Sequence, residues 1–481
     1  MKYRRRLAAM VVGTLMMLSA CTLEPKYVRP DAPMSAPGAA GVATSSPAEV
    51  GWRDFFPDPQ LQQLIALALA NNRDLRVAAL SVETAQARYR IQRADLFPTI
   101  AASGVEQVER VPADVLVPPS PTGGGVISHY YNVGVGFTSF ELDFFGRIRS
   151  LNHAAFEEYI GSEETRRSAQ ITLVAEVASA YLTVLADQTL LDITRQTLQS
   201  QSDSYALTQM TFERGAATEL ALRQAESTVD TARANLAQYA RQLAQDRDAL
   251  QLLLGARIPA GIDFSAGLDR VSMVSELEMG IPSDVLVQRP DVLAAEHLLQ
   301  AANADIGAAR AAFFPAISLT GNFGTASTQL SGLFKQDSQA WTVSPQISVP
   351  IFAGGANVGN LKVAKIARDT AVAQYEKAIQ TAFREVADAL AARGTLDEQL
   401  AAQQALVTAS QDAYRLADMR FRGGVDSYLS TLDAQRSLYS GQQQLQIIRL
   451  LRLQNLVTFY KALGGGLQER TATESNVPRA G

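Results

Sequence analysis

The stretch 418–437, DMRFRGGVDSYLSTLDAQRS, decides the fold because the chain contains it twice. The other copy is 209–228, QMTFERGAATELALRQAEST. An ungapped alignment places Met210 on Met419, Phe212 on Phe421, Gly215 on Gly424 and Leu220 on Leu429. Each copy has the composition of a tight glycine turn between two helices. A repeat of this size predicts one architecture built from two similar halves rather than several unrelated domains.

Proline-free windows flank both turns. No proline occurs between Thr122 and Ile258 or between Ile351 and Val477. Apolar and small residues recur there at alternating spacings of three and four, as in coiled coils. We therefore expect long helices on both sides of each turn, at 147–210, 218–254, 357–419 and 427–463. At 1.5 Å per residue, a helix of some 60 residues is about 90 Å long and needs a repeating partner surface.

Alternating segments predict four strands, two in each half. They lie near 99–109, 129–144, 316–323 and 342–351. Gly134 and Gly136 are spaced like the start of a dinucleotide-binding motif, but a strand with small residues explains them better. Four strands cannot close a membrane barrel, so either they do not cross a membrane or several chains share one barrel. The strands alone leave open whether two or three chains do so.

The N-terminus has the pattern of a secretory signal. Residues 1–20 combine a basic start with an apolar run, and the only cysteine, Cys21, follows at the cleavage position. Leu18-Ser19-Ala20-Cys21 resembles a bacterial lipobox, which predicts a covalent lipid such as palmitate on Cys21 and, with Thr22 next, an outer-membrane location. The alternative is an ordinary signal peptide with a chance cysteine.

The chain order then predicts six segments. They are a lipoprotein signal peptide at 1–20, a lipidated extended tether at 21–57, a first repeat at 58–255, a connector at 256–283, a second repeat at 284–464 and a flexible tail at 465–481. The first repeat begins with a helix at 58–70 that ends at two asparagines.

Composition argues against several classes of protein. The 43 basic and 48 acidic residues give a net charge of −5, which disfavours a nucleic-acid binder. The 3 histidines show no metal-ligand spacing, and a lone cysteine excludes an internal disulfide. No nucleophile–base constellation points to an enzyme. We expect no metal and no cofactor apart from the lipid.

Several motifs, taken in order, resemble the outer membrane factor family, the TolC/OprM type of efflux duct, and its NodT-like lipoprotein branch. They are the lipobox, Tyr27-Val28-Arg29-Pro30, the stretch 52–59, the turns at Phe97-Pro98 and Phe314-Pro315, ELDFFGR at 141–147, VPIF at 349–352, the stretch 421–440 and Lys461-Ala462-Leu463-Gly464.

The resemblance implies a mainly α-helical chain with a membrane β-barrel portion. Three chains would share one twelve-stranded barrel and continue as a helical tunnel in the periplasm. The family works with a periplasmic adaptor and an inner-membrane pump of the resistance-nodulation-division (RND) class, exporting drugs or other small toxic compounds. A channel for type I protein secretion and a lipid-anchored coiled-coil scaffold without a pore are the alternatives.

The turns are the candidate functional sites. Arg214 and Gly215 in the first turn, and Arg422, Gly423 and Gly424 in the second, are expected to face the adaptor.

Asp426 and Asp433 are seven residues apart, which on one helix places them on one face. Repeated in a trimer, they would form carboxylate rings at a periplasmic gate. Asp426 could instead cap the last long helix, with Ser427 competing for that role. The first copy has Ala217 and Gln224 at these positions, so only the second turn is predicted to carry the gate.

Overall fold

The computed structural model describes residues 22–31, 50–112, 125–271, 273 and 286–471. The chain divides into two compact units. The strand unit combines Met1–Pro30, Val82–Gly161 and Ala295–Tyr375, and the hairpin unit combines Asp31–Ser81, Ser162–Ala294 and Glu376–Gly481. The predicted signal peptide, Cys21 and most of the predicted tail lie outside the described residues.

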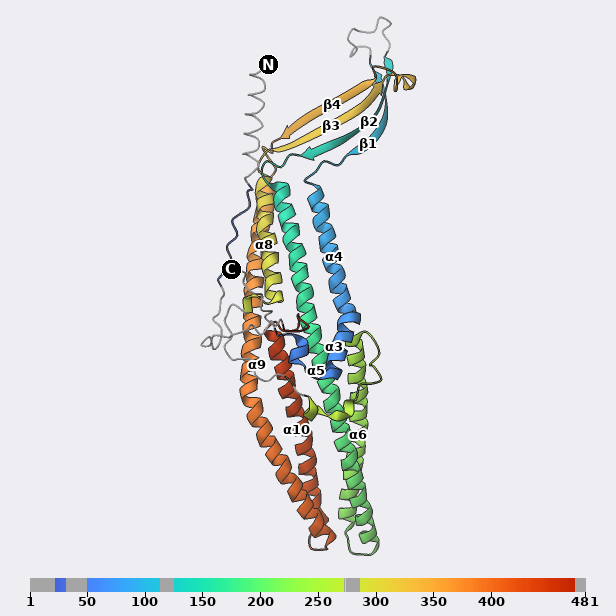
Figure 1. Cartoon of the computed structure of the whole chain (residues 1–481), viewed down its shortest axis with the longest axis vertical. Coiled ribbons are helices and arrows are strands. Elements are labelled where there is room, and N and C mark those ends of the chain that lie inside the picture. Colours follow the sequence, from blue (N-terminus) through green and yellow to red (C-terminus); the bar gives the residue numbers. More distant parts are fainter. Residues whose placement is uncertain (1–21, 32–49, 113–124, 272, 274–285, 472–481) are drawn as a thin grey trace, which may run out of the picture. The chain divides into compact units, whose positions relative to one another are not determined.

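Long helices dominate both halves of the chain (Figure 1). The α-helices whose bounds lie in the described residues are α2 (Trp52–Phe55), α3 (Pro59–Asn71), α4 (Arg73–Ala94), α5 (Arg147–Glu213), α6 (Glu219–Leu254), α8 (Pro290–Ala311), α9 (Ala356–Arg422) and α10 (Tyr428–Ala462), with short 3-10 turns η2 (Phe264–Ala266), η3 (Leu268–Arg270) and η4 (Leu330–Gly332). α5 and α9 have 67 residues each, while α6 and α10 have 36 and 35. Corresponding helices of the two halves thus have nearly equal lengths, which confirms the predicted helical hairpin in each half.

The strand unit contains the four predicted strands in one antiparallel sheet. They are β1 (Ala101–Val111), β2 (Val126–Glu141), β3 (Ala316–Ser327) and β4 (Gln339–Ser348), in the order β1-β2-β3-β4. β2 pairs with β3 across the two halves of the chain, and the register shifts between Phe137 and Phe140. β1 and β4 are the two edges of this sheet.

Glycines let the central strands approach each other closely. A Cβ atom on Gly136 would collide with the backbone of Gly321, and one on Gly324 would collide with that of Val133. These contacts support the interpretation of Gly134 and Gly136 as small strand residues.

Both faces of the edge strand β4 are exposed, and they differ in chemistry. Trp341, Val343 and Ile347 are 73%, 59% and 65% exposed. The residues between them are polar, for example Thr342 and Ser344. This strand therefore presents an apolar face and a polar face, as membrane strands that border water do.

The described parts of the predicted tether at 21–57, residues 22–31 and 50–57, pack against other elements. Residues 22–30 are extended but lie on α8 and α5, with Asn303 Nδ2 donating to Pro25 O at 2.7 Å. Farther along, Trp52, Phe55 and Phe56 are buried, and Phe55 stacks on Tyr460 with the ring centroids 4.0 Å apart. Composition suggested a tether because prolines and small residues dominate this stretch, whereas its contacts lie hundreds of residues away.

Glycine ends the first hairpin of the hairpin unit. Gly255 caps α6 in the left-handed conformation, with φ +62, where a side chain would collide with Asn71. The matching Gly464, just after α10, has φ +83. A Leu-Gly pair follows each turn glycine after forty residues, at 254–255 and at 463–464. These pairs therefore mark the ends of α6 and α10.

Residues at the predicted coiled-coil spacing of three and four pack between the helices of this unit. Ala225, Val229, Ala232 and Leu243 of α6 are buried, whereas most residues at this spacing near the C-terminal end of α9, such as Tyr414 and Ala417, are only half-buried. Among the described residues, α5 contains one window whose length and composition would suit a membrane span, and 61% of that window is buried. This burial is typical of a core helix.

One buried position interrupts the apolar seam of α5. Asp187 is 8% exposed, and its Oδ2 atom has no hydrogen-bond partner in the described part of the chain. Burial, together with the nearby Asp246 carboxyl of α6, raises the pKa of Asp187 to about 8. Asp187 is therefore mostly protonated at neutral pH.

The raised pKa of Asp187 predicts in which direction the stability of the fold changes with pH. The unfolded chain ionises Asp187 near pH 3.8, whereas the folded chain keeps the proton up to about pH 8. The unfolding free energy should therefore fall steadily as the pH rises from 3.8 to about 8, and it should stay constant above that range. We expect Asp187→Asn to flatten this decline, so that its unfolding free energy exceeds that of the wild type more at pH 8 than at pH 5. Urea unfolding at both pH values measures this, and an equal decline in both proteins would contradict the assignment.

Candidate gate and docking turns

The first turn joins α5 to α6 and contains the predicted docking residues Arg214 and Gly215. Gly215 has φ +75, a conformation that glycine adopts without strain, and its N–H donates to Phe212 O at 2.9 Å. Thr218 caps α6 by accepting from Ala221 N at 3.2 Å. Arg214 is exposed, which fits a docking residue without establishing that role.

The second turn, between α9 and α10, has the same backbone. Gly424 has φ +71 and its N–H donates to Phe421 O at 2.9 Å, while Val425 N donates to Arg420 O at 2.9 Å. A Cβ atom on Gly423 would lie 3.3 Å from Met419 O, and the first turn has Arg214 at the equivalent position. The repeat in sequence is thus a repeat in turn geometry.

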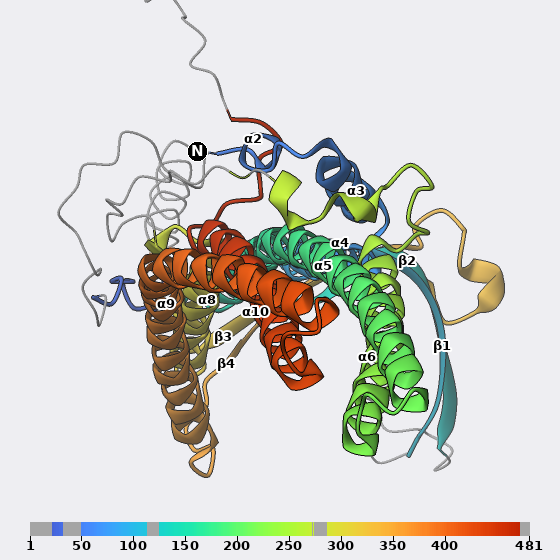
Figure 2. The same ribbon diagram turned by 90° about the horizontal axis from the view of Figure 1, so that it is seen from below.

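The two turns lie at the same end of the hairpin unit (Figures 1 and 2), and side chains pack between them. Tyr428 and Leu432 of α10 pack with Ala225 of α6, and Tyr205 and Phe421 cover this cluster. The Phe421 and Tyr428 rings lie 5.4 Å apart between centroids. The turns therefore form one composite tip.

Ion pairs distinguish the second turn from the first. Arg420 donates to both carboxylate oxygens of Asp426, at 2.6 and 3.0 Å, and Arg422 pairs with Asp418 at 2.8 Å. The Arg420 hydrogen bond and charge lower the pKa of Asp426. In the first turn Ala217 replaces Asp426 and Thr211 replaces Arg420, so the first turn lacks the equivalent ion pair.

The placement of Asp426 and Asp433 corrects one part of the prediction. α10 begins at Tyr428, so Asp426 lies in the turn and the two carboxylates do not share a helix face. Ser427 occupies the N-cap position without a side-chain cap hydrogen bond, so Asp426 is not the cap. Asp433 is exposed on α10. Their role in a gate stays a prediction.

Sequence reasoning missed Arg420 and Asp418, the partners of the charged turn residues. Arg420 is six residues before Asp426, and only a chain reversal brings such residues together. The predicted turn implied that reversal, so the charges flanking it were the available signal. Among the described residues, no group of three histidine, cysteine or acidic side chains could hold a metal ion.

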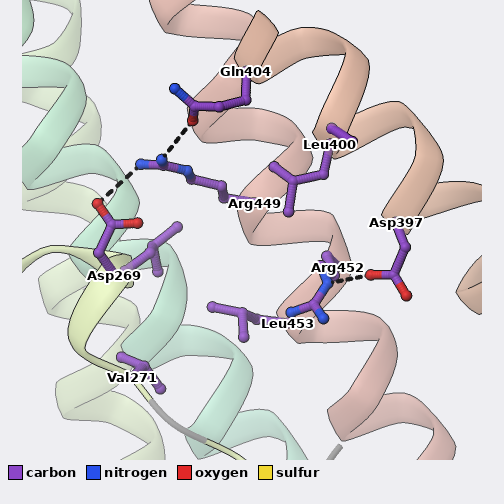
Figure 3. A pocket seen from close by; sticks show the side chains of 10 residues that line it. Asp269, Val271, Asp397, Leu400, Gln404, Arg449, Arg452 and Leu453 are labelled. Atoms are coloured by element: carbon purple, nitrogen blue, oxygen red, sulfur yellow. Dashed lines mark hydrogen bonds and ion pairs between the residues drawn. The ribbon is translucent and has the colours of Figure 1, made fainter.

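A groove in the same unit lies between η3, α9 and α10 (Figure 3). Its volume is about 440 Å³. Arg449 lies 3.0 Å from both Asp269 and Gln404, and Arg452 lies 2.5 Å from Asp397. These two pairs balance the charges that line the groove, whose walls combine them with apolar residues such as Leu400 and Leu453.

Comparison with known proteins shows which family has this architecture. The family model for outer membrane efflux proteins matches residues 64–256 and 281–465. The chain belongs to the outer membrane efflux protein family. The match covers both repeats and leaves out part of the predicted connector.

Two relatives from Pseudomonas putida are each 50% identical over 465 residues, with 95% of either chain covered. They are the antibiotic efflux pump outer membrane protein ArpC and the toluene efflux pump outer membrane protein TtgC. The open state of the Neisseria gonorrhoeae MtrE outer membrane channel matches with a TM-score of 0.84 and 39% identity, covering 94% of this chain and all of that one. As a family member the protein is an outer-membrane channel component, with helical hairpins and a membrane sheet.

Proposed function

We propose that the protein is the outer-membrane exit duct of a tripartite efflux system. The observation that carries this proposal is the four-stranded sheet, which has two open edges and whose edge strand β4 has one apolar face and one polar face. An open edge is not tolerated in lipid, and four strands are too few to close a barrel. Three chains would supply twelve strands and let β1 of one copy pair with β4 of the next.

Such a duct needs no chemistry of its own. Substrates would diffuse along a water-filled interior, and the energy would come from an inner-membrane pump of the RND class. The names of the relatives, which include toluene and antibiotic efflux pumps, support small apolar or amphipathic compounds as the cargo. A lipid on Cys21 would add an anchor in the same membrane.

The composite tip is the proposed docking site for the periplasmic adaptor. Exposed apolar residues surround its turns: Leu220 is 68% exposed, Val425 66% and Leu429 50%. Leu220 and Leu429 are equivalent in the repeat, so both hairpins offer the same contact. Asp426 and Asp433, repeated by the trimer, would place carboxylates near the narrow end and favour cations there.

The docking proposal predicts which positions cross-link to an adaptor. A photoreactive amino acid at Val425 or Leu220 should capture an adaptor-class protein in intact cells, identified by mass spectrometry. Val77 of α4 is 61% exposed and provides a control position away from the turns. Trimers that reach the outer membrane but capture no adaptor from either turn, or capture it equally from Val77, would overturn the docking assignment.

A further inference from the structure

Charged side chains are scarce in the sheet and are divided between its two faces. Apart from His129, the charged side chains of the four strands are Glu106, Glu109, Arg110 and Glu141. β3 and β4 contain none. The pairing register shows which face each charge occupies, because residues directly opposite each other share a face and side chains alternate along a strand.

Glu109 lies on the polar face, defined here as the face of β4 that carries Thr342 and Ser344. Opposite pairs and even spacings along a strand connect one series of positions from β1 to β4: Glu109, Ser128, Asn132, Ala326, Asn322 and Thr342. The other polar-face residues of β3 and β4 are small or neutral, for example Ser318 and Gln346. Glu109 is therefore a charge on a face that is otherwise mostly uncharged.

Glu106 lies on the opposite, apolar face, although only three residues separate it from Glu109. The same register connects a second series of positions across the sheet: Glu106, Tyr131, Ser327, Phe323 and Trp341. On this face His129 Nδ1 lies 3.4 Å from Glu106 Oε1. The two glutamates of β1 thus point to opposite sides of one strand.

The second carboxylate of the polar face is neutralised. Glu141 is opposite Ser318, which is opposite Gln346. Arg147 of α5 donates from Nε and Nη2 to the two oxygens of Glu141, at 2.8 and 2.6 Å. Glu109 is exposed, and its carboxylate forms no ion pair in the part of the chain that the structure describes. Within the described sheet, Glu109 is therefore the polar-face charge without a counterion.

Glu109 lies at the end of the sheet that is remote from the helices. β1 begins at Ala101, soon after α4, and Glu109 is two residues before its other end. β1 and β2 pair as far as Val111 and Val126, whereas the pairs between β2 and β3 end at Tyr131. Glu109 thus belongs to the part of the β1–β2 hairpin that extends past β3.

We propose that Glu109 determines the charge preference of the outer mouth of the duct. This inference rests on the proposed function, in which three chains close one barrel and the polar face lines its water-filled interior. Three copies of Glu109 would then surround the mouth and favour cations over anions there. The neutral side chains of the same face add no such preference. Uncharged and cationic compounds are therefore the cargo that this exit passes most readily.

The expected size of the barrel lets these three charges act across the whole mouth. Twelve strands about 4.8 Å apart and tilted by about 40° give a backbone radius of roughly 12 Å. A glutamate side chain reaches about 5 Å inward, which places its carboxylate about 7 Å from the axis. The Debye length is about 10 Å in 0.1 M salt but about 3 Å in 1 M salt. The preference should therefore be strong in dilute salt and vanish in concentrated salt.

Reversal potentials of single channels test this role. In a potassium chloride gradient near 0.1 M, purified full-length Glu109→Gln should show a cation-to-anion permeability ratio roughly twofold below that of the wild type. Near 1 M the two proteins should agree. Glu106→Gln is the matched control, because it removes the same charge from the other face of β1 and should keep the wild-type ratio.

Two further variants separate the mouth from other causes. Glu109→Asp keeps the charge and should keep the wild-type ratio, so a loss in both Glu109 variants would contradict a role of the charge. In the Asp426→Asn, Asp433→Asn background, which lacks the carboxylates predicted at the tip, Glu109→Gln should still lower the ratio.

The outcomes distinguish the mouth from the duct. Conductance steps with an unchanged ratio in Glu109→Gln, or an equal fall in Glu106→Gln, would overturn the role of Glu109 and leave the duct intact. A wild-type protein that gives no conductance steps would contradict the duct itself, and the inference with it.

Discussion

Arg289→Met should lower the unfolding free energy by about 3 kcal/mol, the lower end of the range for breaking a buried ion pair from one side. Arg289 is 6% exposed and pairs with Asp291 and Glu385 at 2.7 and 2.8 Å. It also donates to Ala462 O, at the C-terminal end of α10, at 2.9 Å. Without it, two acids and a helix carboxyl end would face each other. Because both acids are about a third exposed, water recovers part of the loss.

Urea unfolding in detergent, followed by circular dichroism at 222 nm, measures this loss. Arg452→Met is the matched control, since Arg452 pairs with Asp397 at the surface and should contribute less than about 1 kcal/mol. Equal destabilisation by the two variants would contradict the prediction. It would show that the contacts of Arg289 to α8, α9 and the end of α10 contribute no more stability than a surface ion pair.

The double variant Asp426→Asn with Asp433→Asn should raise the resting conductance of the purified channel and reduce its preference for cations. Each substitution removes one negative charge per chain, and the loss of Asp426 also leaves Arg420 unpaired at the second turn. A pore mouth that changes toward positive charge attracts fewer cations. Weaker turn pairing should also let the tip open more readily.

Planar bilayer recordings in a salt gradient measure both quantities. Glu213→Gln with Glu219→Gln removes two acids beside the first turn and serves as the control. If the gate belongs to the second turn alone, the control should keep the wild-type reversal potential. An unchanged potential and conductance in the Asp426 and Asp433 variant would remove these residues from the gate.

Much of the fold follows from local sequence rules. The long helices were predictable because prolines are absent there and because glycines mark their ends, as Gly215, Gly424 and Gly255 do. The strands were predictable from alternation, with ends displaced by a few residues because pairing partners decide where a strand stops.

The features that the sequence did not reveal depend on distant partners. The stretch 22–30 has a tether-like composition, yet Arg29 binds Glu296, 267 residues away. Asp187 occupies a seam whose neighbours are apolar, and only the packing of α6 supplies Asp246. Asp426 illustrates a nearer failure: its seven-residue spacing from Asp433 suggested a shared helix face, but α10 begins only at Tyr428, and Asp426 lies in the turn, where it pairs with Arg420.

The mass and conductance of the purified full-length protein test the central claim most directly. If three chains close one barrel, the particle in detergent should contain three copies, and each insertion into a planar bilayer should give a stable, water-filled conductance step. A folded, helical protein that remains a single chain in detergent and inserts without any conductance would contradict the account.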